Sequence, residues 1–136
     1  MDEQEYSLEW LAFAEMDLGS AVHLLTYHPL PQEIICFHCQ QSAEKCLKGI
    51  LVLQKITPPK IHNLEELYIL CEPFVPNIYN IKIKCNILNK YSVMPRYPRE
   101  MMITEADVQE ALTCAKDVLE FLKPLFPAVE NNLNRD

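Results

Sequence analysis

Glycine is nearly missing from this sequence, which has two glycines in 136 residues. Hairpins and bulges of β-sheets draw heavily on glycine, so its scarcity argues against a sheet. No apolar run approaches the ~20 residues of a membrane span, and the acidic N-terminus lacks the basic and then apolar order of a secretory signal. We therefore expect a cytoplasmic protein that does not associate with a membrane.

The composition is that of a globular protein, with 49% hydrophobic and 23% charged residues. These values exclude a disordered chain. A chain of this length forms one domain that buries roughly two thirds of its unfolded surface. We expect a single domain over residues 1–136, with a polar, frayed tail at 130–136.

Lysine and arginine are absent from residues 1–44, which contain eight acidic residues. Residues 45–99 reverse this balance, with nine basic against three acidic residues, within a chain of net charge −7. One interpretation is a local anion-attracting surface in the middle of an acidic protein. The other is that oppositely charged segments simply lie side by side in the fold.

Six cysteines occur, at positions 36, 39, 46, 71, 85 and 114. Five of them stand where the helical patterns require a small apolar residue, which predicts buried free thiols in a reducing compartment. Cys36 and Cys39 have the spacing of a metal knuckle, but a helix directs His38 away from them and no second ligand pair follows. We predict neither a metal site nor a cofactor.

Apolar residues recur at spacings of three and four in most of the chain, which predicts helices. The long helices are expected at residues 7–27, 31–55 and 77–93 and from Thr104 up to Pro124, with a short helix at 63–71. In the first of them, Asp17 is expected on the solvent side. Asn63 is the expected N-cap of the short helix, and Thr104 that of the last long helix. The predicted fold class is all-α, an up-and-down helical bundle of four long helices plus one short helix.

The segment 31–55 is expected to be the central helix. Its apolar arc is so wide that several neighbouring elements must cover it. Gly49 lies deep in this helix, where it costs about 1 kcal/mol relative to alanine, so we expect it to allow a close helix crossing. Gln40 lies within the apolar arc and needs a buried hydrogen-bonding partner, such as a loop backbone.

The polar side of the central helix carries the first candidate site, formed by His38, Gln41, Lys45 and Lys48. An imidazole, an amide and two ammonium groups are suited to contact a phosphate or a ribose. The alternative is a solvated helix face with pairs such as Glu44 and Lys48, worth a few tenths of a kcal/mol.

A second candidate lies in the loop before the last helix, where Arg96 and Tyr97 stand between two prolines. A guanidinium and an aromatic ring can bind a phosphate and stack on a base. The alternative is a tertiary clamp that only holds the loop. His62 precedes an N-cap, and we expect it to be structural.

Several motifs together resemble the HEPN domain family. They are Trp10-Leu11 with Ala14, Asp17 and Leu18; Phe37-His38-x-Gln40-Gln41-x-Ala43-Glu44-Lys45-x-Leu47-Lys48; His62-Asn63-Leu64; and Tyr91 followed by Arg96-Tyr97-Pro98. The resemblance implies a helical bundle, usually a homodimer, often encoded beside a minimal nucleotidyltransferase. It also implies one of two activities, metal-independent RNA cleavage or non-catalytic binding of nucleotides or partner proteins.

The ribonuclease members resemble one another through an Arg, a spacer of four to six residues and a His near the start of the last long helix. This sequence has no histidine beyond His62, so that pair is absent. We therefore expect a non-catalytic module that binds a nucleotide or another anion and associates with a nucleotidyltransferase, in the manner of a toxin–antitoxin pair, with RNA not an expected partner. The alternatives are a ribonuclease with a non-standard site and a purely structural dimeric scaffold.

The apolar arcs of the predicted helices exceed what a single bundle can bury. This excess predicts a homodimer that associates through the faces of long helices.

Overall fold

The computed structural model describes residues 2–93 and 102–128, and these form five α-helices and short 3₁₀ turns without a strand. The helices are α1 (Glu3–His23), α2 (Gln32–Leu53), α3 (Leu64–Cys71), α4 (Lys82–Asn89) and α5 (Glu105–Leu122). The predicted all-α class is thereby confirmed. No helix in the described ranges is long and apolar enough to cross a membrane.

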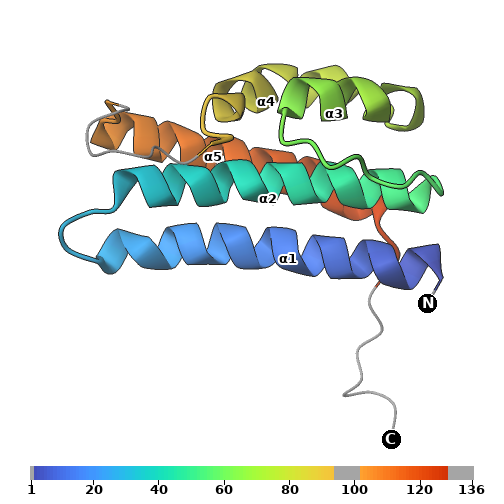
Figure 1. Cartoon of the computed structure of the whole chain (residues 1–136), viewed down its shortest axis with the longest axis horizontal. Coiled ribbons are helices and arrows are strands. Elements are labelled where there is room, and N and C mark those ends of the chain that lie inside the picture. The colour runs from blue at the N-terminus through green and yellow to red at the C-terminus, as the bar shows by residue number, and fades with distance from the viewer. Residues whose placement is uncertain (1, 94–101, 129–136) are drawn as a thin grey trace, which may run out of the picture.

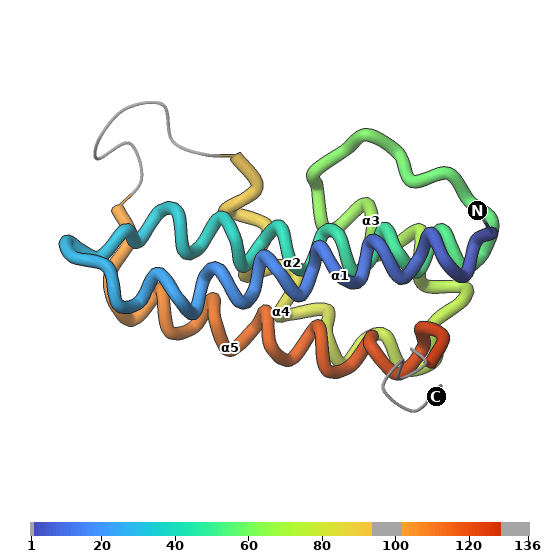
Figure 2. The backbone as a smooth tube through the Cα atoms, turned by 90° about the horizontal axis from the view of Figure 1, so that it is seen from below, coloured from blue at the N-terminus to red at the C-terminus, as the bar shows by residue number. Residues whose placement is uncertain are grey.

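Helix α2 is the centre of the bundle, as its wide apolar arc predicted. It contacts each of the other four helices. Helix α1 runs along one side of α2 as the other half of a helical hairpin, while α3 and α4 lie across the opposite side (Figure 1). The tube view shows the long helices α1, α2 and α5 running along the length of the molecule (Figure 2).

Local signals fix the starts of three helices. The Asp2 side chain accepts from the Glu5 amide and begins α1 before the expected residue 7. Asn63 caps α3, and Thr104 with Asp107 forms a reciprocal capping box at the start of α5. Each of these side chains satisfies helix-terminal amides that have no partner within the helix, so the predicted caps of α3 and α5 are confirmed.

The fourth helix is shorter than the sequence predicted. Ile78–Ile81 forms a 3₁₀ turn, and α4 has only eight residues. Asn77 adopts a left-handed conformation with φ of 60°, and no side chain caps α4. Ile78 and Ile81 are both buried and three residues apart, which matches the three residues per turn of a 3₁₀-helix. The described part of the bundle thus has three long and two short helices.

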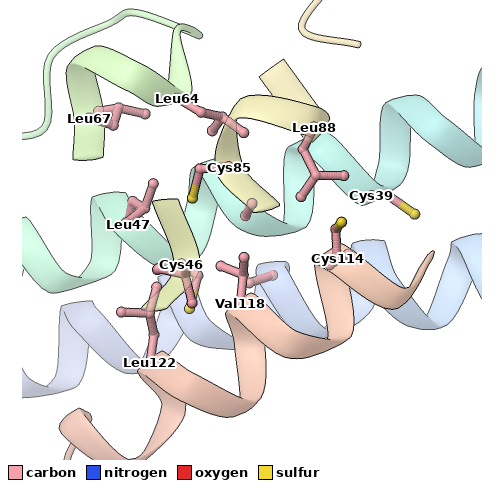
Figure 3. Close-up of a cluster of buried hydrophobic side chains, with 14 of the residues drawn as sticks. Cys39, Cys46, Leu47, Leu64, Leu67, Cys85, Leu88, Cys114, Val118 and Leu122 are labelled. Atoms are coloured by element: carbon pink, nitrogen blue, oxygen red, sulfur yellow. The ribbon is translucent and has the colours of Figure 1, made fainter. Parts of the chain in front are cut away.

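The core combines leucines and cysteines from α2, α3, α4 and α5 (Figure 3). All six cysteines are buried free thiols, as predicted. Burial disfavours the thiolate, and it raises the pKa of Cys36 to about 11 and of Cys39, Cys71 and Cys85 to about 12. These cysteines therefore act as small hydrophobic residues.

Because thiolates are the reactive species, the folded protein should react with a thiol reagent at pH 8 only as fast as it unfolds. Unfolded thiols ionise near pH 8.5, whereas burial raises the pKa of Cys39 to about 12. The free energy of unfolding should accordingly fall as the pH rises through this interval. The rate of thiol modification by dithionitrobenzoate, measured in increasing urea, tests the predicted reactivity, with the fully denatured chain as control. Fast modification of native protein would contradict the prediction.

Candidate anion-binding site

Asp17 of α1 joins two residues of the predicted polar stripe on α2. His38 Nδ1 lies 2.9 Å from Asp17 Oδ1, and Lys45 Nζ donates to Asp17 Oδ2. An ionised carboxylate only accepts, so Nδ1 donates and Nε2 is the nitrogen left for another partner. The side chains of Asp17, His38 and Lys45 are 11%, 29% and 27% exposed. We call these three residues the Asp17 cluster.

The expectation that Asp17 faces solvent is wrong. Asp17 follows Ala14 by three residues and precedes Ala21 by four, and both alanines are fully buried. These spacings place Asp17 on the same helix face. Sequence reasoning missed it because charged residues are assigned to the solvent side by default, although the spacing contained the signal.

A second cluster surrounds Glu44, whose side chain is 4% exposed. Its carboxylate lies 3.2 Å from Lys48 Nζ and 3.1 Å from His62 Nδ1, and it also accepts from Gln40 and Gln41. This set of residues is the Glu44 cluster. The fully buried Gln40 also donates to the backbone carbonyl of His62 at 2.9 Å. The prediction that Gln40 needs a loop backbone as partner is confirmed.

The Glu44 cluster holds the connection between α2 and α3 against the middle of α2. Lys48 and Glu44 form the i,i+4 pair that the sequence suggested, but the pair is buried rather than solvated, with side chains 8% and 4% exposed. A buried pair differs from a surface pair because the loss of one partner leaves a desolvated charge. Lys48 and Gln41 are thus placed at Glu44 rather than in the Asp17 cluster.

The other predicted site residues, Arg96 and Tyr97, lie outside the described ranges. Of the six candidates, the described structure brings His38 and Lys45 together around Asp17 and Gln41 and Lys48 together around Glu44. No group of three or more His, Cys, Asp or Glu residues within 2–93 and 102–128 is placed to hold a metal ion.

Charge compensation explains part of the uneven charge distribution. Lys45 of the basic middle segment pairs with Asp17 of the acidic first segment, and Lys84 pairs with Asp117 of the acidic last segment at 3.2 Å. For these two lysines, the interpretation that opposite segments lie side by side is correct. Lys45 nevertheless keeps part of its surface exposed.

An aromatic ring accompanies the Asp17 cluster. Phe13 of α1 is 54% exposed, and Lys45 Nζ lies 5.8 Å from its ring centroid. This distance is within the range of a cation–π contact. Phe13 was not among the predicted site residues, because an isolated apolar residue outside the helix stripe gives no distinct signal.

The chain belongs to the HEPN domain family, whose sequence profile matches residues 7–125. A relative in Methanocaldococcus jannaschii, named "Putative toxin MJ1304", is 28% identical over 141 residues, which cover 88% of this chain and 87% of that protein. Two crystal structures are similar in fold. ST0689, described as an archaeal HEPN homologue, has a TM-score of 0.69 at 28% identity over 88% of this chain and 96% of its own. TT1696 from Thermus thermophilus has a TM-score of 0.72 at 26% identity over 87% of this chain and 96% of its own.

Proposed function

We propose that this HEPN protein is the non-catalytic, homodimeric member of a toxin–antitoxin-like pair. Its partner is a minimal nucleotidyltransferase. The HEPN protein itself binds a nucleotide phosphate at the Asp17 cluster. The geometry of that cluster is the observation that supports the proposed binding site. One carboxylate fixes an imidazole and an ammonium group beside each other on a partly exposed surface. The relative's name and the family membership support the toxin–antitoxin setting.

The cluster is suited to a phosphate because it is oriented before a ligand arrives. Asp17 uses Nδ1 of His38 and one donor of Lys45. The other ammonium hydrogens of Lys45 are left for phosphate oxygens, and in the imidazolium form of His38 the Nε2–H group donates to a phosphate oxygen as well. A side chain already held in place loses less rotamer entropy on binding. The exposed ring of Phe13 beside Lys45 offers a surface on which a base can stack.

The same carboxylate limits the affinity. Asp17 neutralises one positive charge of the cluster, so the field that attracts an anion is weaker than the predicted basic stripe implied. Two charge-assisted contacts of about 1.5–3 kcal/mol each correspond to dissociation constants from tens of micromolar to several millimolar.

Calorimetric titration with ATP, GTP and AMP at low salt tests the proposal. His38→Asn keeps an amide donor near Asp17 but lacks the group at the position of Nε2, so it should weaken nucleotide binding about tenfold. Lys45→Ala should weaken nucleotide binding by a similar factor. Lys60→Ala removes an exposed lysine of the same basic segment and should bind like the wild type. Binding that is absent, or equal in all variants with intact folds, would leave the structural scaffold as the function.

The second candidate, a ribonuclease with a non-standard site, is favoured by one contact. An imidazole whose Nδ1 is held by a carboxylate can use Nε2 as a general base, without a metal, on an RNA hydroxyl. Incubation of purified protein with RNA in chelator distinguishes the candidates. We expect intact RNA, and cleavage that His38→Asn abolishes would replace the binding function with this one.

A further inference from the structure

A groove of about 520 Å³ runs between α4 and α5, on a surface that the proposed nucleotide site does not use. Tyr79, Ile83 and Ile87 line it from the side of α4. Glu110 and Asp117 of α5 line the other side, and the buried Cys114 also contributes to its surface. The α4 wall is thus mainly apolar and also contains Lys84, whereas the α5 wall is acidic.

The apolar wall is unusually exposed for residues of this type. Ile83 is 73% exposed and Tyr79 is 68% exposed. They stand four residues apart, with Ile87 four residues further on, so the three side chains share one face. Ile87 is partly buried against the core. Single exposed apolar residues are ordinary, but two neighbouring ones along a groove indicate an interaction surface.

Charges of opposite sign flank the groove. The segment from Ile78 through Lys90 has three lysines and no acidic residue, whereas α5 has five acidic residues and one lysine. Lys84 and Asp117 form an ion pair across the groove at 3.2 Å. Of these charged residues, Lys84 lines the groove from α4, and Glu110 and Asp117 line it from α5.

We propose that the α4/α5 groove is the surface on which a second copy of this chain docks. The inference rests on the homodimer of the proposed function and specifies its interface. We place the two-fold axis in the interface and parallel to the groove. The α4 helix of each copy then packs against the α5 helix of the other. Lys84 of each copy then faces the wall that contains Glu110 and Asp117 of the other, and Ile83 and Tyr79 of each copy enter the partner's groove.

The exposed apolar residues of α1 do not fit a second copy. Phe13 and Met16 of α1 are 54% and 61% exposed. Helix α1 contains four glutamates and one aspartate and no lysine or arginine. Two copies that meet through α1 would bring like charges together, which opposes association. The α1 surface therefore supplies matched control positions.

Sedimentation velocity over a dilution series measures the dimer. The wild type should be dimeric at tens of micromolar, and Ile83→Asp should weaken the dimer at least tenfold because it places two carboxylates near the axis. Tyr79→Asp is a second variant at an exposed position, so neither substitution removes a buried group. Met16→Asp, the control on α1, should dimerise like the wild type. A monomeric wild type, or a dimer that Met16→Asp disrupts and Ile83→Asp does not, would overturn the proposal.

Cross-linking tests the position of the axis. The native thiols are buried, so a short bismaleimide should link two Ile83→Cys chains and leave Met16→Cys chains as monomers. Linkage of Met16→Cys alone would overturn the proposed axis. These outcomes are independent of the nucleotide titrations, since the variants lie outside the Asp17 cluster. Loss of nucleotide binding would leave this interface standing, and loss of the dimer would leave the nucleotide site standing.

Discussion

Replacing Glu44 with alanine should lower the free energy of unfolding by about 3–5 kcal/mol, the usual cost of breaking a buried ion pair. The substitution would leave the ammonium of Lys48 in a site where its side chain is 8% exposed. It would also remove one of the acceptors of the buried Gln40, and a buried donor that loses a partner adds a desolvation cost. Urea denaturation, with the slope of each transition compared, measures the change.

A double variant separates the charge from the packing. Glu44→Leu together with Lys48→Met removes both charges and keeps the volume, so it should recover most of the loss. Glu9→Ala removes an exposed glutamate of α1 and should change stability by less than about 0.5 kcal/mol. A Glu44→Ala protein as stable as Glu9→Ala would show that water compensates the charge of Lys48 in solution.

Substitution of the two glycines by alanine should change stability in opposite directions. A Cβ added at Gly49 would lie 2.7 Å from Phe126 Cε1 and 3.1 Å from Trp10 Cβ. Overpacking of this kind costs about 1–3 kcal/mol, more than the roughly 1 kcal/mol that alanine gains in a helix. Gly49→Ala should therefore be destabilising.

Gly19 is the matched control, because it also lies within a long helix but has no atom within 4 Å of an added Cβ. Gly19→Ala should stabilise the protein by about 0.5–1 kcal/mol through helix propensity alone. Thermal or urea unfolding of the two variants compares them directly. Equal stabilisation at both positions would mean that Phe126 moves aside freely and that the close crossing is not required.

Periodic patterns predicted the helices well because the formation of a helix depends on residues that are only a few positions apart in the sequence. The apolar arc of 31–55 identified the central helix, and the caps at Asn63 and Thr104 set the starts of α3 and α5 to the residue. Gly49 and Gln40 were correctly assigned a close contact and a buried partner, because each breaks the pattern of its helix. The length of α4 was not predictable, since an apolar spacing of three fits a 3₁₀ turn as well as a helix.

The sequence by itself determined the family, the all-α bundle and the residue types available for an anion site. Only the tertiary structure decided which charges compensate one another. A helical wheel places His38, Gln41, Lys45 and Lys48 in one stripe, but it contains no information about the neighbouring helix or the connection that covers that stripe. Asp17 reaches Lys45 across 28 positions of the chain, and Glu44 reaches His62 across 18. Electrostatic interactions depend on distance in space and on burial, and both are set by packing rather than by local sequence.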